Sequence, residues 1–182
     1  MSAEGTEARP PGARLPADTR GEGFAAYRLL WTIAASVFLL DQASKAWVAW
    51  RLVYGTYGEA FGAIPVIKGF MYVVHVGNTG AAWSTFSGKS FILALLAAGT
   101  LAAIFVWRRA LGLRLRSHQL CFGLLCGGIL GNLTDRIVRH HVVDFIDLHF
   151  GTYVYPTFNV ADSGICVGVL LYLVLNLRSA DQ

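Results

Sequence analysis

Four long apolar segments dominate this chain of 182 residues and limit what it can fold into. They run from Leu29 to about Val53, from Phe91 to Trp107, from about Gln119 to Leu133, and from about Asn159 to Leu177. A helix needs about 20 apolar residues to cross the roughly 30 Å core of a bilayer. Only 14% of the residues are charged, whereas soluble domains have roughly 25%. The pattern predicts an all-α membrane protein with four transmembrane helices, and it excludes a large soluble enzyme.

The regions outside these segments are predicted from composition. Residues 1–26 are rich in Ala, Gly, Pro, Glu and Arg without an apolar run, which predicts a disordered cytoplasmic tail and not a signal peptide. The membrane domain is expected to cover residues 27–178, followed by a cytoplasmic C-terminus of residues 179–182. The three cysteines lie in apolar stretches without a C-x-x-C pair and are interpreted as packing residues.

Basic residues indicate the orientation of the chain in the membrane. Arg28 precedes the first segment, four arginines lie between the second and third, and Arg178 follows the fourth. Cytoplasmic loops carry an excess of Lys and Arg, so both termini are predicted to be cytoplasmic and residues 54–90 and 135–158 to lie outside. The net charge of +4 then reflects this orientation, and nucleic acid is not an expected partner.

The two outer stretches differ in character. Residues 70–76 of the first form a β-branched and aromatic run, which predicts a strand of a small sheet resting on the bilayer. The second is short, and its aromatic residues Tyr153, Tyr155 and Phe158 are suited to a membrane interface.

Polar residues from every part of the chain gather at the outer ends of the segments. Ionisable groups near membrane depth are costly and mark functional sites. The set comprises Asp41, Asn78, Asn132, Asp135, Arg136, Asp144, Asp147, Asn159 and Asp162. An active site at the extracytoplasmic face is therefore predicted.

Asp144 and Asp162 are the pair best suited to catalysis. Asp144 lies among apolar residues, and Asp162 lies near the start of the fourth segment. If the linker folds back, the two carboxyl groups meet, and one retains a proton because both cannot easily ionise. One member can then activate a water molecule while the other protonates a leaving amine. This is peptide hydrolysis without a metal or a nucleophilic side chain.

Structural roles account for several of the same residues. Asn159 with Asp162 three residues later fits a helix cap. Asp41 and Lys45 fit an i, i+4 ion pair, and Asp135 fits an ion pair with its neighbour Arg136 at a helix end. The spacing of these residues does not distinguish the structural roles from functional ones.

Other chemistries and function classes fit less well. A metal site is disfavoured because its candidate ligands alternate between both faces of a strand; these are His140, His141, Asp144, Asp147 and His149. No G-x-S-x-G motif is present for serine catalysis. A channel or transporter needs polar groups throughout the membrane, and an assembly subunit does not need converging Asp and Asn residues. No cofactor is expected.

Five sequence blocks resemble, in order, those of the bacterial lipoprotein signal peptidase (signal peptidase II) family. They are Asp41-Gln42-Ala43-Ser44-Lys45, Asn78-Thr79-Gly80-Ala81-Ala82-Trp83, the run from Gly127 to Arg136, Val142-Val143-Asp144-Phe145, and Phe158-Asn159-Val160-Ala161-Asp162-Ser163. The resemblance covers about Leu29 to Leu177. It implies four transmembrane helices, an extracytoplasmic β-cradle and a short outer helix, in the inner membrane of a bacterium.

The resemblance also implies an activity. The family is expected to act as an aspartic endopeptidase that removes signal peptides from diacylglyceryl-modified prolipoproteins, cutting just before the lipid-modified cysteine. Its implied partners are these substrates, membrane lipids and inhibitors of the globomycin type. The resemblance assigns catalysis to Asp144 and Asp162, substrate binding to Asn78, Asn132, Arg136 and Asn159, and support to Asp41, Lys45 and Asp135.

Overall fold

The computed structural model describes residues 24–80 and 85–180, and more than half of these lie in four long helices. The helices are α1 (Arg28–Arg51), α2 (Ser90–Val106), α3 (Arg116–Val138) and α4 (Val160–Ala180). The strands are β1 (Ile64–Ile67), β2 (Met71–Asn78), β3 (Val142–Phe150) and β4 (Tyr153–Phe158). Two short 3-10 helices, η1 (Phe24–Tyr27) and η2 (Glu59–Phe61), complete the described elements.

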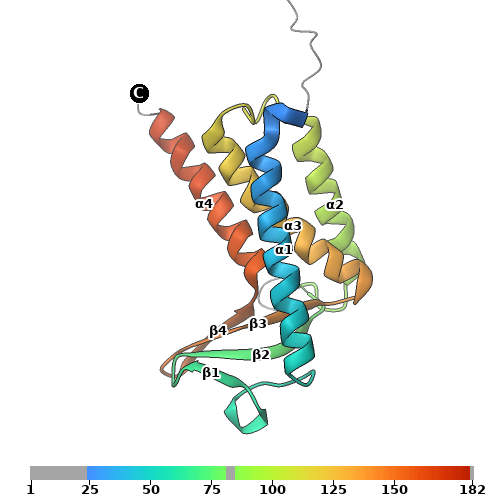
Figure 1. Cartoon of the computed structure of the whole chain (residues 1–182), viewed down its shortest axis with the longest axis vertical. Helices are drawn as coiled ribbons and strands as arrows, with labels where there is room; N and C mark the ends of the chain where they lie inside the picture. Colours follow the sequence, from blue (N-terminus) through green and yellow to red (C-terminus); the bar gives the residue numbers. More distant parts are fainter. Residues whose placement is uncertain (1–23, 81–84, 181–182) are drawn as a thin grey trace, which may run out of the picture.

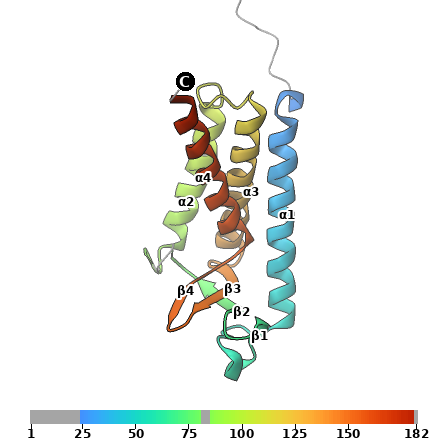
Figure 2. The same cartoon turned by 90° about the vertical axis from the view of Figure 1, so that its left-hand side faces the viewer.

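The four helices form a bundle, and the sheet crosses one end of it (Figure 1). A view turned by 90° shows the same arrangement, with η1 and the C-terminal end of α4 at the opposite end of the bundle (Figure 2). The helix ends predicted to be extracytoplasmic point toward the sheet, and the site is built at the junction between them.

The helices coincide with the four predicted apolar segments, although their ends differ. α3 extends furthest, to Val138 instead of Leu133, because its charged residues there find partners inside the protein. Residues 24–26, predicted to belong to the disordered tail, form η1 with Tyr27, which is buried in the apolar core. The rest of the tail prediction lies outside the described residues.

The outer sheet is larger than predicted, so the description all-α is incomplete. Its strands are antiparallel in the order β1-β2-β3-β4. The predicted strand at residues 70–76 corresponds to β2, and the strand assumed for residues 140–149 corresponds to β3. The strand β4 and its hairpin with β3 were not predicted. A register shift between Ile146 and Leu148 interrupts the alternation on which strand prediction depends. In the described chain, the only helix between α1 and the sheet is η2, a 3-10 helix of three residues.

The bundle exposes many large apolar side chains and buries several polar groups beside its apolar core, which is the pattern of a protein in a lipid environment. Exposed apolar side chains on three helices include Leu39, Leu40, Trp47, Phe91, Leu95, Phe105, Leu170 and Leu173. Buried polar side chains include Asp41, Lys45, Gln119, Asn132, Asp135 and Asn159. By length and composition, Arg116–Val138 and Val160–Arg178 can cross a membrane, and Ser90–Val106 is apolar but shorter. The count of four spans stays a prediction.

Helix α3 lies at the centre of the bundle and packs on α1, α2 and α4. Glycines bring these backbones close together. A Cβ atom on Gly127 would lie 2.6 Å from the carbonyl oxygen of Ala34 in α1, and one on Gly168 of α4 would lie 2.6 Å from the carbonyl oxygen of Cys121. Such small residues permit close packing of membrane helices. Short polar side chains on three helices can consequently reach one another.

A separate polar contact fixes α1 at the end of the bundle away from the sheet. The side chain of Gln119 in α3 is buried. Its Nε2 donates to the carbonyl oxygen of Ala26 at 2.9 Å, and its Oε1 accepts from the backbone N–H of Leu30 at 3.3 Å. The second bond satisfies one of the free donors in the first turn of α1.

Candidate active site

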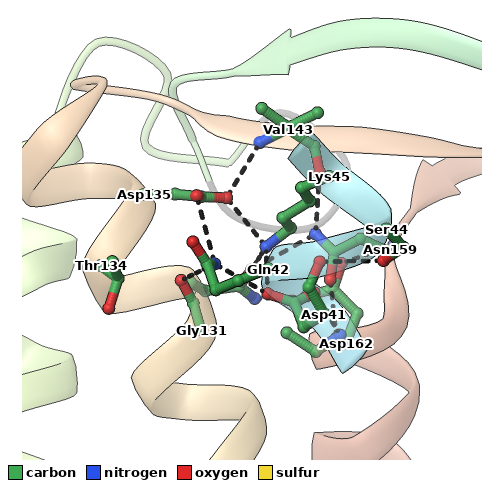
Figure 3. Close-up of polar contacts among 12 residues, drawn as sticks. Asp41, Gln42, Ser44, Lys45, Gly131, Thr134, Asp135, Val143, Asn159 and Asp162 are labelled. Atoms are coloured by element: carbon green, nitrogen blue, oxygen red, sulfur yellow. Dashed lines mark hydrogen bonds and ion pairs between the residues drawn. The ribbon is translucent and has the colours of Figure 1, made fainter. Parts of the chain in front are cut away.

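Polar side chains from α1, β2, α3, β3 and α4 meet where the bundle joins the sheet. Figure 3 shows part of this group, with Asp41 and Lys45 from α1 facing Asp135 from α3 next to the start of α4. The structure thus brings together the nine residues to which the resemblance assigns catalysis, substrate binding or support, through the hydrogen bonds and ion pairs described below.

Asp162 lies in the first turn of α4 and is held there by the helix cap. Its backbone N–H donates to Oδ1 of Asn159 at 3.0 Å, and its Oδ2 accepts from the backbone N–H of Asn159 at 3.2 Å. This reciprocal pair is a capping box. The other carboxylate oxygen, Oδ1, accepts from Nδ2 of Asn132 at 2.7 Å. The cap predicted as a structural alternative is therefore present, and it also orients the carboxylate.

Asp144 lies on β3 and shares Asn159 with Asp162. Its Oδ1 accepts from Nδ2 of Asn159 at 2.7 Å, and its Oδ2 accepts from Nδ2 of Asn78 on β2 at 2.9 Å. Only 3% of Asp144 is exposed. Because one asparagine binds both carboxylates, the linker does fold back and place the two acids at one site.

The surroundings of Asp144 favour its protonated form. Burial, followed by the negative charge of Asp162, raises the pKa of Asp144 to about 7, although hydrogen bonds from Asn78 and Asn159 oppose the shift. A carboxyl group with such a pKa carries a proton in a large share of molecules near neutral pH. It can therefore serve as a general acid there.

A buried ion cluster lies beside the two acids. Nζ of Lys45 lies 2.8 Å from Oδ2 of Asp41 and 2.8 Å from Oδ2 of Asp135, and all three side chains are fully buried. The predicted Asp41–Lys45 pair is therefore confirmed. Asp135 forms its second ion pair with Arg139, and the predicted pairing with Arg136 is replaced, because positions i and i+4 share a helix face and adjacent positions do not.

Comparison with known proteins identifies the family. The sequence model described as signal peptidase (SPase) II matches residues 33–178. The chain is 41% identical over 143 residues to the lipoprotein signal peptidase of Geobacillus kaustophilus (strain HTA426), covering 78% of this chain and 88% of that protein. It is 34% identical over 152 residues to that of Bacillus pumilus (strain SAFR-032), covering 84% and 94%. The chain belongs to the signal peptidase II family.

Solved structures of bacterial membrane enzymes share the fold of this chain. One bacterial membrane enzyme superimposes with a TM-score of 0.74 at 31% identity, covering 83% of this chain and 88% of that chain. A second superimposes with a TM-score of 0.71 at 32% identity, covering 82% and 92%. Membership of the signal peptidase II family makes the chain a peptidase and hence a hydrolase. The channel and assembly-subunit alternatives are therefore rejected.

Arg136 of this signal peptidase II chain donates to two backbone carbonyl oxygens. Its Nη2 donates to that of Gly80 at 3.0 Å, and its Nη1 donates to that of Asn132 at 3.3 Å. Among the described residues, its buried Nε has no partner. It also lines a cavity of about 210 Å³ between α2, α3 and α4. The lining residues are Ala97, Thr100, Ile129, Asn132, Arg136, Asp162 and Ile165. The cavity thus gives access to Asp162.

Two contacts of the site were missed by sequence reasoning. Nε2 of Gln42 lies 3.1 Å from Oδ2 of Asp41 and 3.4 Å from Oδ1 of Asp135. Its position next to Asp41 was the only available signal. Oδ1 of Asp41 accepts from the backbone N–H of Ala161 at 2.9 Å. No side-chain pattern indicates this second contact, because its donor belongs to the backbone.

His149, the histidine of β3, forms a separate contact. Nε2 of His149 lies 2.7 Å from Oδ2 of the buried Asp147, away from the contacts of Asp144. Within residues 24–80 and 85–180, no three His, Cys, Asp or Glu side chains are grouped so that they could hold a metal ion.

Proposed function

We propose that this chain is an intramembrane aspartic endopeptidase that removes signal peptides from diacylglyceryl-modified bacterial prolipoproteins. The observation that carries the proposal is the position of Asp144 and Asp162, two buried carboxyl groups joined through Asn159 at the end of an apolar bundle. Relatives at 34–41% identity that bear the name lipoprotein signal peptidase support the class of substrate.

The proposed chemistry uses the two acids in different protonation states. Asp162, which accepts N–H groups from Asn132 and Asn159, takes a proton from a water molecule. The water oxygen then bonds to the scissile carbonyl carbon. When the tetrahedral intermediate collapses, the C–N bond breaks and Asp144 gives its proton to the leaving nitrogen. The products are a carboxylic acid and a free amine, and no cofactor takes part.

In the proposed topology, this chemistry takes place at the extracytoplasmic surface of the inner membrane. All four helices cross the bacterial inner membrane, both termini are cytoplasmic, and the sheet lies outside. A substrate with an apolar signal helix and two acyl chains then reaches Asp162 laterally, through the cavity that α2, α3 and α4 enclose. Inhibitors of the globomycin type are expected to occupy the same cavity. The cut falls just before the lipid-modified cysteine.

Cleavage of a purified prolipoprotein tests the function. We expect the protein, in lipid nanodiscs, to release a fragment whose first residue is diacylglyceryl-cysteine, identified by mass spectrometry. Each buried CH₂ of the lipid contributes about 0.8 kcal/mol, so an unlipidated precursor is expected to have a kcat/KM about 100-fold lower. Equal cleavage of both precursors, or a cut elsewhere, would contradict the proposed specificity.

Activity is expected to fall as the pH rises through about 7. Burial raises the pKa of Asp144 to about 7, so this carboxyl group is protonated below that pH and ionised above it. Only the protonated form can supply the leaving nitrogen with a proton. The measurement is the pH profile of kcat/KM from pH 5 to 9. Its acidic and basic limbs report apparent pKa values of Asp144 and Asp162 as a coupled pair. Constant activity from pH 6 to 9 would argue against Asp144 as the acid.

A further inference from the structure

We propose that Lys45 is a positioning residue that holds the side-chain amide of Asn132 in the one orientation that presents an N–H to Asp162. The hydrogen bonds and ion pairs of Lys45 go to Asp41, Asp135 and Asn132 and not to Asp144 or Asp162, the two acids of the proposed dyad. The inference rests on the proposed function only in taking Asp162 as a member of the dyad.

The first step concerns the donors of Lys45. Its side chain is fully buried, and its ammonium group has three acceptors: Asp41 Oδ2 at 2.8 Å, Asp135 Oδ2 at 2.8 Å and Asn132 Oδ1 at 3.0 Å. An ammonium carries three N–H donors and no acceptor. All three donors are therefore used by groups of the protein, and none is left for a substrate.

The second step concerns the orientation of Asn132. An amide has an oxygen that accepts and a nitrogen that donates. Because Lys45 can only donate, the atom of Asn132 that faces it must be the oxygen. The nitrogen is then directed to Oδ1 of Asp162, at 2.7 Å. The reverse orientation would place donors against the ammonium and the amide oxygen against a carboxylate, so both contacts would be lost.

Asn159 provides a comparison within the same site. Its Oδ1 accepts from the backbone N–H of Asp162 at 3.0 Å, so the cap of α4 is enough to direct its Nδ2 to Asp144, and Nδ2 also donates to the carbonyl oxygen of Val143 at 3.3 Å. Asn132 lies in the middle of α3 and has no backbone donor of this kind among its hydrogen bonds. Its oxygen accepts from Lys45 and, at 3.3 Å, from Nδ2 of Asn159. The contact with Lys45 is the shorter of the two, and its donor is charged, whereas the donor of Asn159 is neutral.

The charges around Asp162 make the orientation consequential. The charged groups that act on it are Lys45 and Asp41 from α1, Arg136 from α3 and Asp144 from β3. An N–H facing a carboxylate favours its ionised form, and an oxygen in the same place disfavours it. The orientation of this amide therefore contributes to how readily Asp162 accepts a proton from water, together with the cap of α4 and the nearby charges.

Two variants test the inference. Asn132→Asp keeps an oxygen for Lys45 but replaces the N–H that faces Asp162 by a second oxygen. Lys45→Met with Asp135→Asn removes the ammonium together with one of its carboxylates, so no net charge is added to the cluster. Gln119→Leu is the matched control, because it removes a buried polar contact between the same two helices at the far end of the bundle.

The expected results separate positioning from folding. In Asn132→Asp, kcat is expected to fall about 100-fold, with KM within about threefold and the acidic limb of the pH profile moved to higher pH. The charge-balanced Lys45 variant is expected to lose turnover by about 10-fold or more. Adding Asn132→Asp to it should give no further loss, because the two residues act as a unit. The control variant Gln119→Leu is expected to lower thermal stability but to leave the pH profile of cleavage unchanged.

Other outcomes overturn the inference. Normal turnover in the folded Lys45 variant, or fully additive losses, would show that Lys45 does not act through Asn132. If the Lys45 variant does not fold, Asn132→Asp decides: normal turnover contradicts the inference, and a loss with a shifted acidic limb supports it. Failure of the proposed function is distinct, because the wild-type protein and Asp162→Asn would then give the same absence of cleavage.

Discussion

Replacing Asp144 or Asp162 by Asn is expected to lower kcat for prolipoprotein cleavage by about 1000-fold in each case. The amide keeps the size of the side chain but can neither take a proton from water nor give one to the leaving nitrogen. Single-turnover cleavage of a diacylglyceryl prolipoprotein, followed by gel shift and mass spectrometry, measures the loss. The double variant should lose little more than either single one, because the two acids work as a unit.

Asp147→Asn is the matched control for this experiment. Asp147 lies on the same strand and is fully buried, but its partner is His149 and not Asn159. We expect this variant to retain turnover within about threefold. Thermal unfolding of all variants shows whether they are folded. Normal turnover in folded Asp144→Asn or Asp162→Asn would remove that residue from the dyad.

The second large effect is expected from Gly128→Ala in α3. The added Cβ would overlap the backbone carbonyl of Ala161 and lie 2.8 Å from Cγ1 of Ile165, both in α4. The two helices must then separate, which costs about 1–3 kcal/mol of the free energy of unfolding. Because Ala161 precedes Asp162, the shift also lengthens the contact between Asn132 and Asp162, and cleavage is expected to fall with stability.

Gly99→Ala in α2 is the matched substitution. A Cβ at Gly99 meets no atom within 4 Å, and alanine in a helix is favoured over glycine by roughly 0.5–1 kcal/mol. This variant should therefore be as stable as the wild-type protein or slightly more stable. Unfolding in detergent micelles, monitored by circular dichroism, measures both variants. Equal stability of the two would show that α3 and α4 tolerate a larger separation.

Prediction from sequence was successful where the relevant physics is local. Long apolar stretches specify helices, and the four segments correspond to α1–α4. The i, i+4 spacing of Asp41 and Lys45 specified their ion pair, and the three-residue spacing of Asn159 and Asp162 specified their cap. In each case the partners lie within one helical turn, so the distance between them follows from helix geometry alone.

Prediction was less successful in the outer stretches. The hairpin β3–β4 joins strands whose alternation is broken by a register shift and by Pro156. Its pairing with β2 depends on residues far apart in the chain, such as Val76 opposite Asp144. Residues 24–26 were assigned to the tail, but they form η1 with Tyr27, and the carbonyl oxygen of Ala26 accepts from Gln119 in α3.

The amino-acid pattern was enough to predict an apolar bundle and a gathering of polar residues at one end of it, because burial and charge costs in a membrane depend mainly on residue type. The catalytic roles of Asp144 and Asp162 stay a proposal. The hydrogen-bond partner of each polar atom depended on tertiary packing. The carboxylate of Asp41 caps the backbone of Ala161, 120 positions away. Lys45 and Asp162 meet the two ends of Asn132 only because glycines bring α1, α3 and α4 into close contact. An amide has no preferred orientation until its neighbours are in place.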